Sequence, residues 1–471
     1  MRITAHGLRR RFIGDRAFYH RTAAILVPMM IQNTVSNVVS LLDNVMVGQV
    51  GTLQMSAVAI INQLMFVFNL CIFGGLAGAG IFGAQYAGAG DHDGLRHCFR
   101  IKLMLAAAMV VAGTAVFLLG QDPLITMYLA EGTDAADAAL TTGFAKDYLY
   151  VMLFGLLPFG LSQVYSSTLR ETGETRLPML ASVTAILVNL LFNWLLIFGS
   201  LGFPQLGVTG AAIATVLSRY VECAIIAVYT HTHGARHPFI RHAYRSLRVP
   251  AALWKQVAVK GSPLLLNEFL WSSGMAMLLQ CYSVRGLDVV AACNINSTVS
   301  NLFNVVFISM GSAVSVLIGQ RLGARDIEGA KTDVWRLNAL AVVSSAAVGL
   351  VMFLLAPVIP HIYNTSDEVI GIACSLLRVG AVMMPLYAYC NNCYFILRSG
   401  GKTLITFLFD SVFTWVFSFT TAWCLAHLTG MDVVSMYLCV EALNLLKCVI
   451  GTVLVVKGVW IHNLTVGTEE T

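Results

Sequence analysis

Charged side chains are scarce in this sequence. Asp, Glu, Lys and Arg make up 11% of its 471 residues, whereas about a quarter of the residues in a soluble domain are charged. Hydrophobic residues account for 57% of the chain, and the mean hydropathy is +0.76. This balance excludes an ordinary soluble protein, so we expect a chain that crosses a membrane many times.

The sequence also lacks the motifs of ATP-driven pumps and of several enzyme classes. It contains no G-x-x-x-x-G-K-[ST], H-E-x-x-H or G-x-S-x-G motif. Gly78, Gly80 and Gly83 do match G-x-G-x-x-G, but they lie in an apolar segment with no preceding strand, which favours close helix packing over a nucleotide site. We therefore predict no enzyme, no catalytic residue and no cofactor, and active transport would have to draw on an ion gradient.

Twelve segments are long and apolar enough to cross about 30 Å of hydrocarbon. The predicted fold class is therefore an all-α integral membrane protein with twelve transmembrane helices. The predicted spans are Ala23 to Val47, Ala57 to Ala84, Leu103 to Gly120, Tyr148 to Leu169, Leu177 to Gly199, Gly207 to Thr230, Val257 to Ser283, Val289 to Gly319, Leu337 to Ala356, Ala373 to Leu397, Leu404 to His427 and Val434 to Val456.

Lys and Arg alternate between the connecting segments as orientation in a membrane requires. The N-terminal segment, the connections after the even-numbered spans and the C-terminus hold 23 of the 29 Lys and Arg residues. The other connections hold only Lys146 and Arg285. Both termini are therefore predicted to be cytoplasmic. Orientation also explains the net charge of +5, so no nucleic-acid partner is expected.

An internal repeat divides the chain into two halves. GAQYAGAGDHDGLRH, beginning at Gly83, recurs as IGQRLGARDIEGAKT, beginning at Ile318. The aligned pair Gln85 and Gln320 lies 235 residues apart. Because each half holds an even number of spans, both halves enter the membrane from the same side, which predicts two parallel six-helix repeats around a central cleft.

The repeat predicts three parts of the chain. They are an N-terminal six-helix bundle with a basic leading segment at 1–230, a cytoplasmic linker at 231–255 and a C-terminal six-helix bundle at 256–471. The linker is basic and contains four histidines, but no acidic or Cys ligand accompanies them. We expect a solvated linker and no metal site there.

The first span carries a polar stripe that a lipid-facing helix would not carry. Its polar side chains recur at helical steps of four, four and three, so they share one face. They are Gln32, Ser36, Ser40 and Asp43, with Asn37 on the adjoining row. An ionised Asp near the bilayer interior costs about 2.5–3.5 kcal/mol on insertion scales, and such residues mark ion or substrate pathways. We predict that this face lines a cavity.

Three acidic residues within the spans have no basic residue within one helical turn: Asp43, Glu268 and Asp410. A buried carboxylate of this kind could load and release a proton, or it could hold Na⁺ among amide and hydroxyl oxygens. A third possibility is a hydrogen bond to a neighbouring Asn or Ser across helices. The sequence leaves these alternatives open.

Two further acidic residues within the spans have basic neighbours along the chain. Glu222 follows Arg219 by three residues, and Glu441 precedes Lys447 by six. Ion pairing within the helix, or a snorkelling basic side chain, is a reasonable interpretation for Glu222 and a weaker one for Glu441.

Polar faces recur on other spans, which favours a hydrated cavity, and aromatic and methionine side chains near them suit flat or cationic organic molecules. With the acids above, the candidate cation-coupling residues are Asn37, Asn189 and Asn193. With the stripe of the first span, the candidate cavity residues are Trp271, Met275, Asn294, Asn301, Tyr387 and Asn391.

Several motifs resemble the multidrug and toxic compound extrusion (MATE) family. They are LLDNVMVGQVG, GAQYAGAGD, LRETGETRLPM, SPLLLNEFLWSSG and LRSGGKTL, and they occur in the family's order. LNEFLW and FLFDSVFTW resemble the branch common in Firmicutes and related bacteria. The resemblance implies a multi-pass antiporter of the bacterial cytoplasmic (inner) membrane. Such a protein exports small organic, often cationic compounds in exchange for Na⁺ or H⁺ by alternating access, as a monomer in contact with membrane lipid.

The resemblance also implies roles for particular residues. It matches Asp43 to the family's acid in the first span, and Asn189 and Asn193 to the polar positions beside it. The NorM branch has an acid in the tenth span where this sequence has Tyr387, so the half that couples to the ion stays open. The alternative function is a lipid or oligosaccharide-lipid flippase of the same superfamily.

Overall fold

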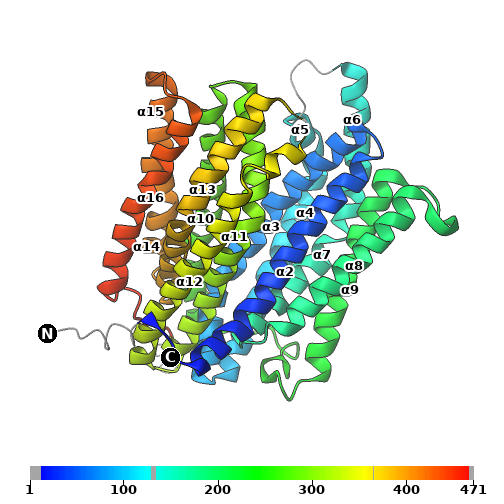
Figure 1. Cartoon of the computed structure of the whole chain (residues 1–471). Coiled ribbons are helices and arrows are strands. Elements are labelled where there is room, and N and C mark those ends of the chain that lie inside the picture. The colour runs from blue at the N-terminus through cyan, green and yellow to red at the C-terminus, as the bar shows by residue number, and fades with distance from the viewer. Residues whose placement is uncertain (1–11, 129–133, 364, 466–471) are drawn as a thin grey trace. The chain divides into compact units, whose positions relative to one another are not determined.

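The computed structural model describes residues 12–128, 134–363 and 365–465. All regular secondary structure in these residues is helical (Figure 1). The helices of the first half are α2 (Arg16–Gly48), α3 (Thr52–Ala89), α4 (His92–Leu119), α5 (Gln121–Thr126), α6 (Ala135–Leu153), α7 (Leu156–Glu171), α8 (Arg176–Phe198) and α9 (Gly207–Thr232), with the 3₁₀ turn η1 (Ser200–Gly202). The connection to the second half contains the 3₁₀ turn η2 (Pro238–Ile240).

The second half repeats this order of long helices. It contains α10 (Ala251–Ser283), α11 (Leu287–Gly323), α12 (Ile327–Leu355), the 3₁₀ turn η3 (Ile359–Ile362), α13 (Asp367–Ser399), α14 (Thr403–Phe407), η4 (Leu408–Val412), η5 (Thr414–Phe419), α15 (Thr420–Leu428) and α16 (Val433–Val456). Pro28 in α2 and Pro263 in α10 lie at the same offset of 235 residues as Gln85 and Gln320. The repeat therefore extends to the first helix of each half.

Ten helices of the described residues are long and apolar enough to cross a membrane, and the pair α6 and α7 makes an eleventh span. The remaining long helix, α10, has 33 residues and is therefore about 50 Å long. Asn267, Glu268 and several serines make α10 less apolar than the other spans. Its length and its place in the repeat complete the twelve predicted spans.

The fourth span differs from the single helix predicted at Tyr148 to Leu169. The helix breaks between α6 and α7 with a bend of 47°. Pro158 lies in the first turn of α7, where its missing N–H is tolerated, and Gly155 precedes that turn. The break therefore has a local cause that periodicity alone did not predict.

The eleventh span is the predicted segment Leu404 to His427, but its backbone is irregular. Two π-helical segments, η4 and η5, lie between α14 and α15. Asp410 is inside the first of them. Short π-helical segments inside α-helices are frequently found at functional sites.

Side-chain caps fix the start of three helices of the second half. Asp326, Ser366 and Asp432 each accept a hydrogen bond from the backbone amide three residues on, at the starts of α12, α13 and α16. Hydrogen bonding by backbone amides lowers the pKa of the Asp326 and Asp432 carboxyls. Such caps satisfy amides that have no partner within the helix.

The chain packs as two compact units. The first unit contains the described residues up to Met30, Ala84–Asp91 and the residues from Lys255 onward. The second unit contains Ile31–Gly83 and His92–Trp254. The start of α2 and the end of α3 therefore pack with the second half of the chain.

The segment between the halves packs against the second unit. The Arg100 guanidinium on α4 donates to the carbonyl oxygens of His242 and Ala243 at 2.9 Å and to that of Arg248 at 3.2 Å. Phe239 is fully buried. Most residues of this segment are exposed, as a solvated linker predicts, but Arg100 holds its backbone, and Phe239 and Ile240 are buried.

Candidate functional site

The carboxylate of Asp43 lies among α2, α8 and α9 in the second unit. Asn193 Nδ2 on α8 donates to Asp43 Oδ1 at 2.7 Å. Asn189, one turn earlier, donates to the same carboxylate when its amide is oriented with the nitrogen 3.0 Å from Asp43 Oδ1 and the oxygen 3.3 Å from Thr215 Oγ1 of α9. The three residues that the resemblance links therefore lie together.

The environment of Asp43 stabilises an anion without neutralising it. Within the described part of the chain, no Lys or Arg forms an ion pair with this carboxylate. Asn193 Oδ1 is buried and accepts no hydrogen bond from the described residues. A carboxylate beside an oxygen that still lacks a donor suits a proton or an oxygen-preferring cation.

The other polar residues of the predicted stripe lie along α2, before Asp43. Ser40 Oγ donates to the Ser36 carbonyl at 3.0 Å, Ser36 and Asn37 are half-buried, and Ser40 is exposed. Gln32 is tied into a hydrogen-bond chain, because its Nε2 donates to Ser182 of α8 at 2.7 Å. Gln32 thus joins two helices of the unit.

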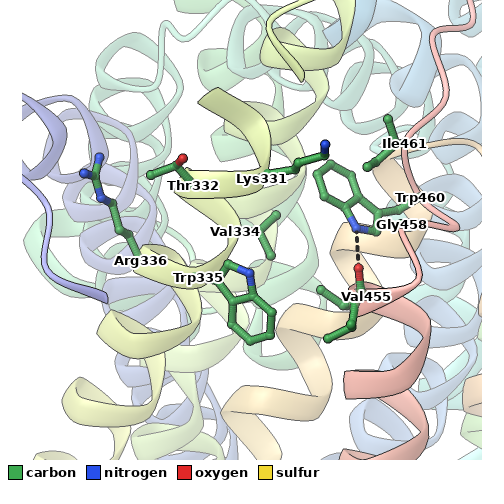
Figure 2. Close-up of a pocket in the computed structure, with 10 residues that line it drawn as sticks. Lys331, Thr332, Val334, Trp335, Arg336, Val455, Gly458, Trp460 and Ile461 are labelled. Atoms are coloured by element: carbon green, nitrogen blue, oxygen red, sulfur yellow. Dashed lines mark hydrogen bonds between the residues drawn. The ribbon is translucent and has the colours of Figure 1, made fainter. Parts of the chain in front are cut away.

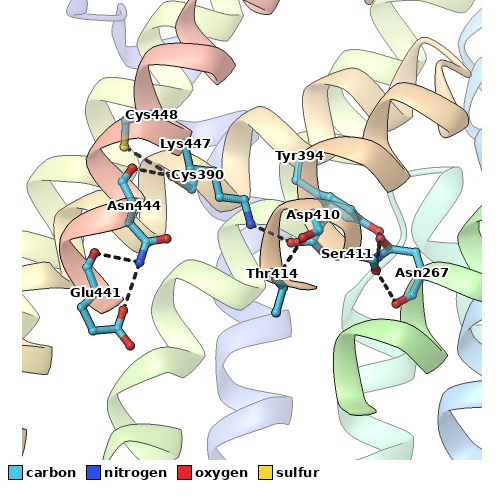
Figure 3. A network of polar contacts seen from close by, with 10 residues as sticks. All are labelled: Asn267, Cys390, Tyr394, Asp410, Ser411, Thr414, Glu441, Asn444, Lys447 and Cys448. Carbon is cyan, nitrogen blue, oxygen red and sulfur yellow. Dashed lines mark hydrogen bonds and ion pairs between the residues drawn. The ribbon is translucent and has the colours of Figure 1, made fainter. Parts of the chain in front are cut away.

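Asp410 has no basic residue within one turn of its own helix, as predicted, but it has a direct cationic partner on another helix. Lys447 Nζ on α16 lies 2.8 Å from Asp410 Oδ1, and Asn267 Nδ2 on α10 donates to Asp410 Oδ2 at 3.1 Å (Figure 3). Asn267 is buried, and it also lies 3.3 Å from Tyr394 Oη and accepts from Ser411 Oγ at 2.7 Å. Lys447 was missed because it is 37 residues away on another helix.

The other two acidic residues within the spans of the second half, Glu268 and Glu441, form no direct ion pair among the described residues. Among the described residues, the half-buried Glu268 carboxylate has no hydrogen-bond or ion-pair partner. Glu441 accepts from Tyr387 Oη at 2.7 Å and from Asn444 Nδ2 at 3.0 Å. The weaker interpretation, in which Glu441 pairs with Lys447, is wrong because Lys447 forms its ion pair with Asp410.

The remaining candidate cavity residues are not gathered in one place by any observed contact. Asn391 Nδ2 on α13 donates to the Phe307 carbonyl of α11 at 2.9 Å, so it joins two helices. The others have exposed side chains on α10 and α11. They are Trp271, Met275, Asn294 and Asn301.

The comparisons with known proteins identify the family. The MatE family model matches residues 28–195 and 263–424, which is most of both halves. The chain belongs to the MATE family. This MATE chain is 27% identical over 398 residues to the probable multidrug resistance protein NorM of Thermotoga maritima, covering 83% of this chain and 82% of that protein. It is 24% identical over 426 residues to the probable multidrug resistance protein YoeA of Bacillus subtilis, covering 88% of each.

Solved structures of MATE transporters share the fold. A MATE family multidrug resistance transporter of the MOP superfamily, solved in an outward-facing conformation, superposes with a TM-score of 0.82 at 22% identity, over 97% of this chain and 98% of the other. A mutant of the Vibrio cholerae MATE transporter VcmN gives 0.83 at 19% identity, over 95% and 98%. The predicted twelve-helix, two-repeat membrane fold is thereby confirmed, and membership of this family indicates transport rather than catalysis.

A cleft of about 650 Å³ lies in the first unit of this MATE chain (Figure 2). Lys331 and Trp335 of α12 line one wall, and Val455 and Trp460, at and beyond the end of α16, line the other. The Trp460 indole donates to the Val455 carbonyl at 3.1 Å, which fixes the second wall. None of the candidate coupling or cavity residues lines this cleft.

Proposed function

We propose that this chain exports small organic, often cationic compounds across the bacterial cytoplasmic membrane in exchange for H⁺ or Na⁺. The relatives are named as multidrug resistance proteins, which supports a substrate of this class. The observation that carries the proposal is the Asp43 carboxylate, which is bound by two asparagines and paired with no basic side chain among the described residues. Asp43 is the coupling residue.

The chemistry around Asp43 suits either coupling ion. A proton on the carboxyl would make it neutral, and its O–H could then donate to the oxygen of Asn193. Na⁺ would instead take oxygen ligands from Asp43, from the Asn193 and Asn189 amides and from the Thr215 hydroxyl. Either ion removes the cost of an uncompensated charge in a membrane interior, so binding is favourable.

The second half contributes less to ion coupling in this proposal. At Asp410 the ammonium of Lys447 already supplies the cation, at 2.8 Å. Glu268 has no such partner among the described residues and is the acid that would share or replace the role of Asp43. The first half therefore binds the coupling ion, and Glu268→Gln is the variant with which Asp43→Asn is compared.

Antiport follows when the ion and the organic substrate favour opposite states of the transporter. A potential of about 150 mV supplies roughly 3.5 kcal/mol for each unit charge moved, enough for a substrate gradient of a few hundredfold. Loss of the coupling carboxylate removes this drive but not the fold. Substrate then only equilibrates across the membrane.

The proposal includes the orientation of the chain in the membrane and its oligomeric state. The distribution of Lys and Arg supports cytoplasmic termini and a cytoplasmic linker at 231–255. The functional unit is a monomer surrounded by lipid, with no cofactor other than the coupling ion. Reporter fusions placed after Gly120 and after Val249 test the orientation, and they should report opposite sides of the membrane.

Transport in proteoliposomes tests the function. A Na⁺ gradient and a pH gradient are imposed separately, and one of the two should drive accumulation of a fluorescent organic cation by the wild-type protein. If neither gradient drives uptake while labelled lipid crosses the bilayer in a protein-dependent manner, the flippase alternative replaces the antiporter.

A further inference from the structure

A chain of hydrogen bonds across four helices leads to a second carboxylate, Glu222. Arg170 Nη2 on α7 donates to Gln32 Oε1 on α2 at 2.9 Å, and Gln32 Nε2 donates to Ser182 Oγ on α8 at 2.7 Å. Ser182 Oγ in turn donates to Glu222 Oε1 on α9. All four residues belong to the second unit.

Glu222 does not pair with Arg219, as its position on the same helix suggested. The Arg219 guanidinium lies over the Phe159 ring, 5.0 Å from its centroid, and donates to the Gly155 carbonyl at 3.4 Å. The helix therefore directs Arg219 toward α7 and Glu222 toward α8. The predicted ion pair within α9 is wrong.

Glu222 has no direct basic partner among the described residues, whereas Glu171 of the same unit does. Lys102 Nζ contacts Glu171 Oε1 directly at 2.5 Å, and such a contact neutralises a carboxylate in place. Glu222 is separated from the Arg170 guanidinium by the neutral side chains of Gln32 and Ser182. Because Coulomb attraction falls with distance, Glu222 keeps more of its capacity for another cation.

The same two helices connect Glu222 with Asp43. The contact between Gln32 and Ser182 and the contact between Asp43 and Asn193 both join residues 150 positions apart, so α2 and α8 run parallel in one register. The two contacts are 11 residues apart on each helix, which corresponds to about 16 Å. The polar stripe of α2 fills the interval between them.

We propose that Glu222 is a second cation-binding carboxylate, which receives the coupling ion from Asp43 and releases it toward the N-terminal end of α2. This inference rests on the proposed antiport. If the ion is a proton, the Asp43 carboxyl becomes a carboxylate as the Glu222 carboxylate becomes a carboxyl, with serine hydroxyls and water between them. If the ion is Na⁺, the same ion moves and no bond is broken.

The charges around Glu222 give the transfer its direction. The charged and titratable groups near it are Arg170 from α7 and, on its own helix, the Cys223 thiol and Arg219, whose guanidinium is directed toward α7. A cation on Glu222 leaves the positive charge of Arg170 less balanced, whereas Asp43 has no basic residue paired with it among the described residues. The ion is therefore held more tightly at Asp43 and released more readily at Glu222.

Exchange of Glu222 for glutamine tests the proposal in proteoliposomes that contain the full chain. Gradient-driven uptake of the fluorescent cation by Glu222→Gln should be at least tenfold slower than wild type, while the Kd for that cation stays within twofold. Glu222→Asp should restore at least part of the rate. The pH profile of uptake, or its Na⁺ dependence, should shift in Glu222→Gln and in Ser182→Ala.

A matched serine controls for packing. Ser218 lies one turn before Glu222 on α9, and its hydroxyl donates only within its own helix, to the Thr215 carbonyl at 2.8 Å. Ser218→Ala should keep the wild-type rate and profile. If Glu222→Gln does not insert at normal levels, the uptake rate and ion dependence of Ser182→Ala are compared with those of Ser218→Ala. A change in Ser182→Ala alone supports the role of Glu222, and no difference between the two variants overturns it.

The outcomes separate this inference from the proposed function. If Asp43→Asn abolishes coupling but Glu222→Gln and Ser182→Ala keep the wild-type rate and ion dependence, Glu222 is only structural and the inference is overturned. If wild-type protein shows no ion-driven uptake at all, the proposed antiport itself has failed.

Discussion

The ion pair between Lys447 and Asp410 joins two helices by an electrostatic contact that the sequence did not predict. The two side chains are only 12% and 17% exposed, and their charged atoms are 2.8 Å apart. Lys447→Met keeps most of the aliphatic length and removes the cation. Asp410 then remains as a buried charge with Asn267 as its remaining side-chain donor. Removing one partner of such a pair costs about 3–5 kcal/mol.

The ammonium of Lys447 also lies over two aromatic rings. Its Nζ is 5.2 Å from the centroid of Phe409 and 5.6 Å from that of Phe413. Each contact of this kind adds about 0.5–1 kcal/mol or more when desolvated. The loss in Lys447→Met should therefore fall at the upper end of the range given above.

Chemical denaturation in mixed micelles measures this loss. Lys447→Met should lower the free energy of unfolding by about 3–5 kcal/mol, and adding Asp410→Leu should recover most of it, because the second change removes the unpaired charge. The coupling energy of this double-mutant cycle should exceed about 2 kcal/mol. A Lys447→Met protein that unfolds within about 0.5 kcal/mol of wild type would refute the reasoning.

Three further predictions concern packing, pH and the segment between the halves. Gly323→Ala should destabilise the protein by about 1–3 kcal/mol in the same denaturation assay, because the added Cβ would overlap the Gln85 carbonyl oxygen. Backbone hydrogen bonding by Ser435 lowers the pKa of Asp432, so its capping contribution is complete above the ordinary carboxyl range and is lost as pH falls through the lowered value. Asp432→Ala should therefore reduce the unfolding free energy by about 1 kcal/mol at about pH 7 and by less at about pH 3. Arg100→Ala should release the linker, and limited proteolysis should cleave it at least several times faster than in wild type.

Each of these predictions has a contrary outcome. A Cβ added at Gly371 would meet no neighbouring atom within 4 Å, so Gly371→Ala is the matched control and should leave stability within about 0.5 kcal/mol. If Gly371→Ala and Gly323→Ala lower the free energy of unfolding equally, steric overlap is excluded as the cause. If Asp432→Ala lowers the free energy of unfolding equally at neutral and acidic pH, the ionised carboxylate is not the source of the capping contribution. If the linker is cleaved at the wild-type rate in Arg100→Ala, the arginine does not anchor the linker.

The architecture was predictable because membrane spans and repeats leave strong signals along the chain. Hydropathy, the alternation of Lys and Arg and the offset between Gln85 and Gln320 predicted the order of the helices. The break before Pro158 was not predicted, because the segment around it is apolar on both sides. The polar Asn267 and Glu268 weaken the hydropathy of α10, although the repeat still identifies it as a span.

The candidate site was predictable only in part. Helical spacing and the family motif predicted that Asp43, Asn189 and Asn193 lie together. Contacts between distant helices left no such signal: Lys447 reaches Asp410 from α16, and Ser182 reaches Glu222 from α8. Proximity along one helix was a poor guide to these partners, since Arg219 contacts α7 whereas Glu222 accepts from Ser182 of α8.

Ion release on substrate binding tests the role of Asp43 most directly. Purified protein in a weakly buffered detergent solution is mixed with a saturating organic cation, and released protons or Na⁺ are counted with an indicator. Wild type and Asp410→Asn should release about one ion for each substrate bound, whereas Asp43→Asn should release none while still binding substrate. Release from Asp43→Asn at the wild-type level, together with its loss in Glu268→Gln, would contradict the assignment and move the coupling site to the second half.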